Sequence, residues 1–469
     1  MSTAEEDLLH CRLQLEANTE YFLYIGELKS DCLNQFLQEA LSRKYGKKFS
    51  FISIIPDVLS CYPDKNLLVL NPESRKLSAG KGHRVNSRTS ARTFASQVSN
   101  SSRIQALVQD LLQSQGRLFL HVYESVPELT LANLPGVTLL GPDPEIASLW
   151  NNKLHQLQTL QQTTAPVIDF RICTSRKELL QTTAGLWPKW QQGLFISQPY
   201  SAAGMNSFLA YSQRELEKIQ LPADSSFLVS RYIPHQADPT VLGVVAGPDQ
   251  VFIAMVADQD IQEGNKFKGS SFPSALSAEI QQELQEQSRE VGSCLGQSGY
   301  KGIFGCDFIV DDQGKLHFVE VNARKQGTTM EMCCTLENLL PAGAPNLLEL
   351  ELYAVTQGRL PKGTQELQEA APALCWRTYN YKTESRIWLQ ENLRQEQDER
   401  ELFRQVARGQ QEQGLLILEH PGAGVQAEPG TFVGRVVAVS SRKGFLEPAI
   451  KRGRQSIANS IQTLEGQEP

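Results

Sequence analysis

Two apolar runs separated by a short polar turn constrain the fold of this chain more than any other segment. Residues 302–310 (GIFGCDFIV) and 315–324 (KLHFVEVNAR) flank the turn 311–314 (DDQG). Apolar runs around a polar turn that ends in glycine are typical of a β-hairpin. A four-residue turn would place Asp307 opposite Phe318.

The hairpin face that carries Asp307 is expected to hold most of the polar groups, because side chains alternate between the faces of a strand. With this register the face would also hold Phe318, Glu320, Asn322 and Arg324, and the opposite, apolar layer would hold Val319, Val321 and Ala323. Two neighbouring carboxylates stay ionised together only when cations lie close to them. Mg²⁺ takes oxygen ligands, including one or two carboxylates and substrate phosphates. The pattern therefore predicts a magnesium site of Asp307, Glu320 and Asn322, with a solvated edge hairpin as the alternative.

Strand-like and helix-like segments alternate in the first 140 residues. The predicted strands cover 21–25, 49–55, 67–70 and 118–123, and the predicted helices cover 29–43 and 104–113. Such alternation predicts a parallel, doubly wound α/β sheet. Further along the chain, the pattern predicts one helix over 144–162 that carries Lys153, and one polar helix over 385–408.

Composition excludes several classes of protein. A length of 469 residues predicts two or three domains. A formal net charge of -7 argues against a dedicated nucleic-acid binder. No apolar stretch is long enough to cross a bilayer, and residues 1–20 are polar and acidic. Nine scattered cysteines without a paired motif predict reduced thiols and a cytoplasmic protein.

The segment 73–103 is basic in an otherwise acidic chain. Against one acid, Glu73, it carries Arg75, Lys76, Lys81, Arg84, Arg88, Arg92 and Arg103. A solvated loop is the simpler interpretation and is preferred. A flap over an anionic substrate or an acidic carrier protein is the alternative.

Asp307 and the run Glu-Val-Asn-Ala-Arg at 320–324, followed by Gln326, resemble the metal-binding strand pair of ATP-grasp enzymes such as biotin carboxylase and D-alanine–D-alanine ligase. The resemblance is clear over 141–335. It implies that Asp307, Glu320 and Asn322 hold two Mg²⁺ ions on ATP. It also implies that Arg324 faces an acyl phosphate and that Lys268 lies in a substrate loop, so both are expected to be catalytic.

The same resemblance implies where ATP binds. The expected contacts come from Lys153, Gln198, Ser201, Gly204, Ser230, Ile233 and Asp238. Gln198 stands where the family usually has a lysine, and Ser230 stands where it has an acid at the adenine hinge. A neutral amide at position 198 can donate a hydrogen bond but supplies no charge.

The resemblance also implies a domain order. A pre-ATP-grasp parallel-sheet domain would occupy 1–140, and an ATP-grasp fold of two α+β subdomains would occupy 141–368. A lid is expected at about 190–235, and a small C-terminal α+β domain would occupy 369–469.

The expected activity is ligation of a carboxylate to an amine, both small molecules, through an acyl phosphate and with release of ADP. Transfer to a carrier-protein thiol is one alternative, and a nucleotide-binding pseudoenzyme is another. A bicarbonate-using carboxylase is a weaker one, because no biotin-carrier signature is present. A homodimer is possible by analogy with relatives.

Overall fold

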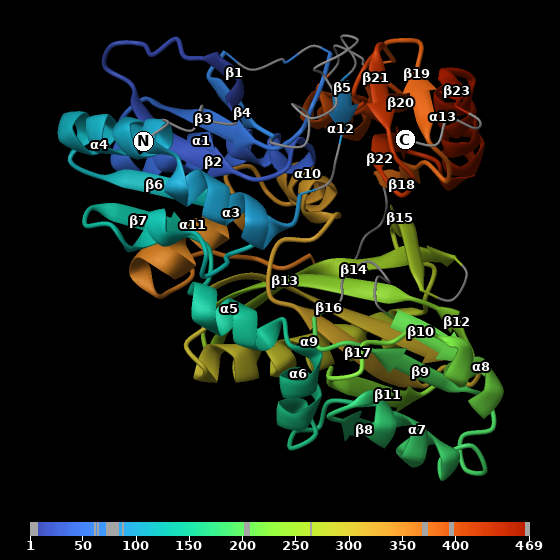
Figure 1. The fold of residues 1–469 in the computed structure, drawn as a ribbon. Helices are drawn as coiled ribbons and strands as arrows, with labels where there is room; N and C mark the ends of the chain where they lie inside the picture. The colour runs from blue at the N-terminus through green and yellow to red at the C-terminus, as the bar shows by residue number, and fades with distance from the viewer. Residues whose placement is uncertain are drawn as a thin grey trace, which may run out of the picture. The chain divides into compact units, whose positions relative to one another are not determined.

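The computed structural model describes residues 8–60, 62, 65–71, 84–86, 89–200, 207–262, 265–367, 374–393 and 398–464. Contacts divide the chain into two compact units, Met1–Glu145 with Gly327–Pro469, and Ile146–Gln326 (Figure 1). Among the helices within the described ranges, none combines the length and the apolar character needed to cross a membrane.

The first unit contains a six-stranded sheet whose neighbouring strands are parallel except at one edge. Its order is β1 (Leu8–Arg12), β4 (Leu67–Leu70), β3 (Phe49–Ile55), β2 (Glu20–Ile25), β6 (Leu118–Val122) and β7 (Val137–Leu140). Only the edge strand β1 runs antiparallel to its neighbour. Helices α3 (Ala91–Asn100) and α4 (Ser102–Gln115) pack on one face of the sheet. Helices α1 (Leu33–Tyr45) and α11 (Leu347–Gln357) pack on the other face. The predicted parallel, doubly wound sheet is therefore confirmed.

The C-terminal part of this unit is an antiparallel sheet with helices. Strand β22 (Phe432–Ser440) lies between β18 (Cys375–Lys382) and β20 (Gln413–Leu418), and α13 (Leu446–Asn459) packs on them. A second small sheet has the order β23 (Ile461–Thr463), β19 (Ile387–Leu389), β21 (Val425–Ala427) and β5 (Arg84–Asn86). The basic segment 73–103 is thus joined to this sheet through the backbone of β5, which runs parallel to β21. Its residues Arg75, Lys76, Lys81 and Arg88 lie outside the described residues. The described part of the unit also contains the short 3-10 helices η1 (Leu28–Ser30), η2 (Thr130–Asn133) and η3 (Lys443–Phe445).

The single polar helix predicted over 385–408 is wrong. The segment contains strand β19 and, after it, helix α12 (Glu399–Ala407). Ile387 and Leu389 are buried while Trp388 between them is half-buried, which is the alternation of a strand. Asp398 starts the helix separately, because its carboxylate accepts a hydrogen bond from the Arg400 backbone at 3.0 Å.

The second unit contains two antiparallel sheets. The larger has the order β12 (His235–Ala237), β16 (Gly302–Asp311), β13 (Pro239–Gly247), β14 (Gln250–Gln262) and β15 (Lys266–Phe272), and β17 (Leu316–Asn322) pairs with β16. The smaller has the order β10 (Ser207–Ala210), β9 (Leu194–Ser197), β11 (Phe227–Arg231) and β8 (Phe170–Cys173). The helices of this region are α5 (Pro144–Trp150), α6 (Lys153–Leu160), α7 (Arg176–Ala184), α8 (Gln213–Lys218) and α9 (Ala278–Gln297).

Helix α9 covers one face of the larger sheet and so defines its buried side. Cys306 and Phe308 of β16 share a core cluster with Leu284 and Val291 of α9. The approach is close at Gly296, where a Cβ atom would lie 2.6 Å from the backbone of Gly247. Because side chains alternate along a strand, the residue between Cys306 and Phe308 points to the opposite face. That residue is Asp307.

A buried ionic cluster fixes helix α10 (Thr329–Leu339) inside the first unit. Arg435 of β22 contacts three carboxylates, from Glu331 of α10, Glu399 of α12 and Glu419. Its guanidinium lies 2.8 Å from an oxygen of Glu399 and 2.8 Å from an oxygen of Glu419. Burial raises the pKa of Glu399 to about 8, although Arg435 opposes the shift. Both oxygens of Glu399 accept hydrogen bonds from the guanidinium, which ties α12 to β22.

The substitution Arg435→Met should lower the free energy of unfolding by about 3–5 kcal/mol, because it leaves buried carboxylates without a cation. Urea unfolding of the full chain measures the change. Arg442→Met is the control, because Arg442 is 79% exposed where it pairs with Glu412. This exposed pair should contribute less than about 1 kcal/mol. Equal losses in the two variants would contradict the structural role of the cluster.

Candidate active site

The two carboxylates predicted to bind metal face each other directly across the β16–β17 ladder. Asp307 pairs with Glu320, whereas Phe308 pairs with Phe318, so Val319 is an extra residue in a β-bulge. The predicted register, with Asp307 opposite Phe318, is therefore wrong. The bulge was not visible in the sequence, because it changes the pairing without changing the apolar pattern.

The bulge also changes which side chains share a face. Phe318 is 1% exposed and lies in the core with Phe308, not on the face of the carboxylates. Val321 and Ala323 are in the same core, as expected, whereas Val319 at the bulge is half-buried. One extra residue lets Phe318 and Glu320 point to opposite sides although they are two positions apart. Glu320 and Asn322 remain on the face of Asp307, because the Asn322 amide donates to Asp307 Oδ2 at 2.8 Å.

Four neutral side chains donate hydrogen bonds to the Asp307 carboxylate. Thr240 Oγ1 and Gln259 Nε2 each lie 2.7 Å from Oδ1, and Gln326 Nε2 lies 3.3 Å from the same oxygen. Asn322 contacts Oδ2. Burial raises the pKa of Asp307 to about 6 and the charge of Glu320 adds to the rise, while the hydrogen bonds from Thr240, Asn322 and Gln326 oppose it. The carboxylate is thus held at a fixed orientation without a positive charge on any of these four partners.

The donor set fits a hard divalent cation. Within the described residues, no group of three or more His, Cys, Asp or Glu side chains is arranged to hold a metal. A cation here would have to be held by two carboxylates and the carboxamide of Asn322, with other oxygens supplied by a ligand. Mg²⁺ is commonly bound through one or two carboxylates together with phosphate oxygens and water.

Lys153 provides the positive charge next to Glu320. Its ammonium group forms an ion pair with Glu320 Oε2. The single helix predicted over 144–162 is wrong, because Asn152 interrupts it. The Asn152 carboxamide accepts hydrogen bonds from the backbone of Leu154 at 3.0 Å and of His155 at 3.5 Å, so α6 begins at Lys153. The backbone of Lys153 also donates to Pro199 O at 2.9 Å, which joins α6 to the segment after β9.

Gln156 is a positioning residue that the sequence analysis did not identify. Its buried carboxamide accepts from Val321 N at 2.9 Å and donates to Val321 O at 2.7 Å. It also donates to Trp150 O at 2.5 Å. Helix α6 is thereby fixed to the strand position between Glu320 and Asn322. A buried glutamine on the apolar face of a predicted helix was the only available signal.

Comparisons with known proteins identify the domain that carries these residues. A family model described as an ATP-grasp domain matches residues 150–328. The chain contains an ATP-grasp domain. The match spans Lys153, Asp307, Glu320, Asn322 and Arg324.

A curated relative is the [butirosin acyl-carrier protein]--L-glutamate ligase of Niallia circulans, which is 23% identical over 209 residues. The match covers 43% of this chain, and the chain spans about half the length of that relative.

Solved structures are similar over almost the whole chain. N5-carboxyaminoimidazole synthase from Aspergillus clavatus, in complex with ADP and its ribonucleotide ligand, has a TM-score of 0.57 and 15% identity, covering 94% of this chain and 99% of that one. The biotin carboxylase of Campylobacter jejuni has a TM-score of 0.61 and 12% identity, covering 95% and 92%. The biotin carboxylase domain of the Hydrogenobacter thermophilus 2-oxoglutarate carboxylase, a dimer with MgADP, has a TM-score of 0.62 and 14% identity, covering 95% and 90%. At these identities the likeness shows the fold.

The remaining predicted residues lie at several places in the second unit, which contains most of the ATP-grasp domain. Arg324 lies 3.5 Å from the Asn151 carboxamide, which also accepts from Ala323 N at 3.1 Å. Lys268 is the extra residue of a bulge in β15, between the pairs Asp260–Gly269 and Ile261–Phe267. A bulge can redirect a side chain, and bulges are frequent next to active sites.

The predicted nucleotide contacts lie on or after the smaller sheet of the ATP-grasp domain. Gln198 directly follows β9, Ser230 is buried in β11, and Ile233 is buried just after β11. Asp238 forms a 3.0 Å ion pair with His235, and this hydrogen bond raises the pKa of His235 against the effect of burial. Ser201 and Gly204 lie outside the described residues.

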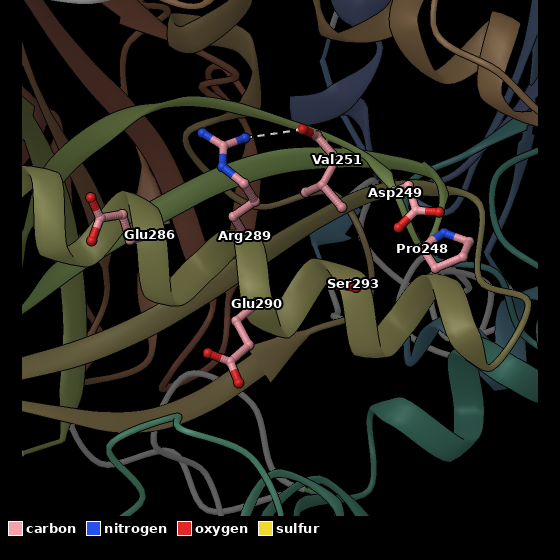
Figure 2. A pocket seen from close by; sticks show the side chains of 7 residues that line it. All are labelled: Pro248, Asp249, Val251, Glu286, Arg289, Glu290 and Ser293. Carbon is pink, nitrogen blue, oxygen red and sulfur yellow. Dashed lines mark hydrogen bonds between the residues drawn. The ribbon is translucent and has the colours of Figure 1, made fainter.

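A shallow depression on the other side of the larger sheet is not part of this site (Figure 2). It is lined by α9 and the β13–β14 turn, through Pro248, Asp249, Val251, Glu286, Arg289, Glu290 and Ser293. Arg289 donates to Val251 O at 3.1 Å, and Glu290 accepts from Thr164 N at 3.0 Å. Figure 2 shows that Arg289 and Glu290 point to different sides of the helix, so they do not converge on a ligand.

The substitution Gln156→Leu should lower the free energy of unfolding by about 2–4 kcal/mol, because it leaves buried backbone groups of Val321 and Trp150 without partners. Urea unfolding measures the loss. Gln158→Leu on the same helix is the control, because Gln158 is exposed and its replacement should change stability by less than about 0.5 kcal/mol. A loss in the control as large as that in Gln156→Leu would show that the effect belongs to the helix and not to the contact with β17.

Proposed function

We propose that this protein is an ADP-forming ligase that activates a carboxylate as an acyl phosphate. One observation carries the proposal: Asp307 and Glu320 face each other across two paired strands of an ATP-grasp domain, with Asn322 and Lys153 in contact with them. Two facing carboxylates stay ionised together only when cations lie close to them. Lys153 supplies one positive charge beside Glu320, and the donors around Asp307 are neutral. An exchangeable cation carried in with a nucleotide satisfies that requirement.

ATP and two Mg²⁺ ions are the proposed cofactors, with Asp307, Glu320 and Asn322 as the residues that hold metal. When bound, Mg²⁺ would neutralise charge that develops on the phosphate oxygens. The solved structures containing ADP and MgADP support this choice through the shared fold.

The chemistry needs one phosphoryl transfer and one acyl transfer. An oxygen of the substrate carboxylate attacks the γ-phosphorus, and ADP leaves. An amine then attacks the acyl carbon, phosphate leaves, and the amine loses a proton. Lys153 and Arg324 would supply fixed positive charge to the anionic oxygens, and Lys268 would contact the carboxylate substrate.

Nucleotide binding is assigned to residues of both sheets of the second unit. Backbone groups at Ser230 and Ile233 would contact the purine, Asp238 the ribose, and Gln198, Ser201 and Gly204 the phosphates. The segment of about 190–235 would close as a lid and exclude water that hydrolyses acyl phosphates. The proposal also includes domain boundaries at residues 140 and 368, a cytoplasmic location and a homodimer.

The acceptor can be an amine or a carrier-protein thiol. The amine is the first candidate, because the fold is shared with enzymes that form bonds to nitrogen. The relative from Niallia circulans, named as a ligase of an acyl-carrier protein and L-glutamate, favours a carrier as the second candidate.

The substitution Glu320→Gln should abolish ADP release without unfolding the protein, because it removes one of the two opposed carboxylates and keeps the shape of the side chain. ADP release is measured with a coupled assay over a panel of amino acids and small acids, and folding by thermal melting. Glu290→Gln, which alters a carboxylate on α9 outside the site, should retain full turnover. Undiminished turnover in Glu320→Gln would remove the assignment. ATP binding by the wild type without ADP release for any acid would instead favour a pseudoenzyme.

Two parallel incubations identify the acyl acceptor. Both contain the enzyme, ATP and amino acids; one adds free amines and the other adds a holo acyl-carrier protein. A mass increase of the carrier equal to one acyl group, reversed by hydroxylamine, is expected for a thioester. A dipeptide or amide with an unmodified carrier is expected for the amine acceptor. Each outcome excludes the other as the main reaction.

A further inference from the structure

The Asp307 carboxylate is bonded unequally at its two oxygens. Oδ1 accepts three hydrogen bonds, from Thr240, Gln259 and Gln326. Oδ2 accepts one hydrogen bond, from the amide of Asn322. A carboxylate has about four lone-pair sites on its two oxygens. Three donors therefore saturate Oδ1, and the oxygen next to Asn322 is the one left for a cation.

Among the three donors to Oδ1, Gln259 forms the short hydrogen bond that does not compete with a second acceptor. Thr240 has one hydroxyl proton and two acceptors within reach, Asp307 Oδ1 at 2.7 Å and Gln326 Oε1 at 3.1 Å. Gln326 Nε2 is farther from Oδ1, at 3.3 Å. Gln259 Nε2 lies 2.7 Å from Oδ1. A hydrogen bond of this length from an N–H group to a carboxylate is short and strong.

The backbone holds Gln259 in place from two sides. Its N–H donates to Asp238 O at 2.9 Å, and the residue pairs with Ser270 of β15. The space for Gln326 beside it depends on Gly305, because a Cβ there would lie 2.3–2.5 Å from the Gln326 carboxamide. The donors around Oδ1 thus come from two strand positions, Thr240 and Gln259, and from Gln326, whose carboxamide occupies the space beside Gly305.

We propose that Gln259 is a positioning residue that makes Asp307 a ligand through one oxygen and thereby gives the site its preference for Mg²⁺ over larger cations. The inference rests on the proposed function. Mg²⁺ requires near-octahedral geometry at short distances, whereas Ca²⁺ accepts longer distances and carboxylates that bind through both oxygens. A carboxylate whose second oxygen is occupied by protein donors favours the smaller ion. Outer partners of this kind commonly change metal affinity about 10–100-fold.

The test is calorimetric titration of ADP into the full-length protein in the presence of Mg²⁺ or Ca²⁺. For Gln259→Leu, we expect Mg²⁺-dependent ADP affinity to fall about tenfold and Ca²⁺-dependent affinity to fall by a smaller factor. Gln259→Met has a similar length, no charge and no donor at that atom, so it should narrow the ratio of Mg²⁺-dependent to Ca²⁺-dependent ADP affinity in the same direction. A loss of packing alone would lower both affinities equally, so the ratio separates positioning from a structural effect.

Gln262→Leu is the matched control, because Gln262 lies on the same strand and bonds to Asp260 instead, at 3.3 Å. It should leave the ratio unchanged. An unchanged ratio in both Gln259 variants, when wild-type binding depends on metal, overturns this inference and leaves the proposed function standing. Wild-type ADP binding that does not depend on metal overturns the proposed function and this inference with it.

Discussion

Repulsion between two carboxylates held opposite each other is the constraint on which the rest of the site depends. The β16–β17 ladder fixes Asp307 against Glu320 through backbone pairing, so the side chains cannot move apart as they would on a loop. The protein places one ammonium group, from Lys153, beside Glu320 and neutral hydrogen-bond donors around Asp307. Neutral donors orient a carboxylate but do not cancel its charge, and part of the repulsion is left for a ligand to relieve.

Local backbone features bring these groups together. The bulge at Val319 lets Phe318 enter the core while Glu320 faces Asp307. The Asn152 cap starts a helix at the residue that pairs with Glu320, and Gln156 bonds that helix to β17. The bulge, the helix cap and the glutamine each involve a single residue. Each sets the orientation of a side chain and leaves the topology of the sheet unchanged.

That scale explains what could be predicted from the sequence. The alternating elements, the hairpin and the pairing of acidic groups on one of its faces follow from apolar periodicity, which extends over many residues. The register of Asp307 and the break before Lys153 depend on a single inserted or capping residue, so periodicity could not show them. Gln259 was invisible for another reason: it reaches Asp307 across β13, and no spacing along the chain encodes contacts between strands that are not neighbours in sequence.

The chain treats buried acids in two different ways, and the difference separates structure from function. Around Arg435, a permanent guanidinium bonds to three carboxylates, and burial raises the pKa of Glu399 although Arg435 opposes the shift. In that cluster each carboxylate bonds directly to a cation that the chain itself supplies. At Asp307 the four hydrogen-bond donors are neutral and oriented, and burial together with the charge of Glu320 raises the pKa of the carboxyl. A carboxylate whose protein partners are all neutral can take a cation from a ligand, whereas carboxylates bonded to one guanidinium hold helices in place.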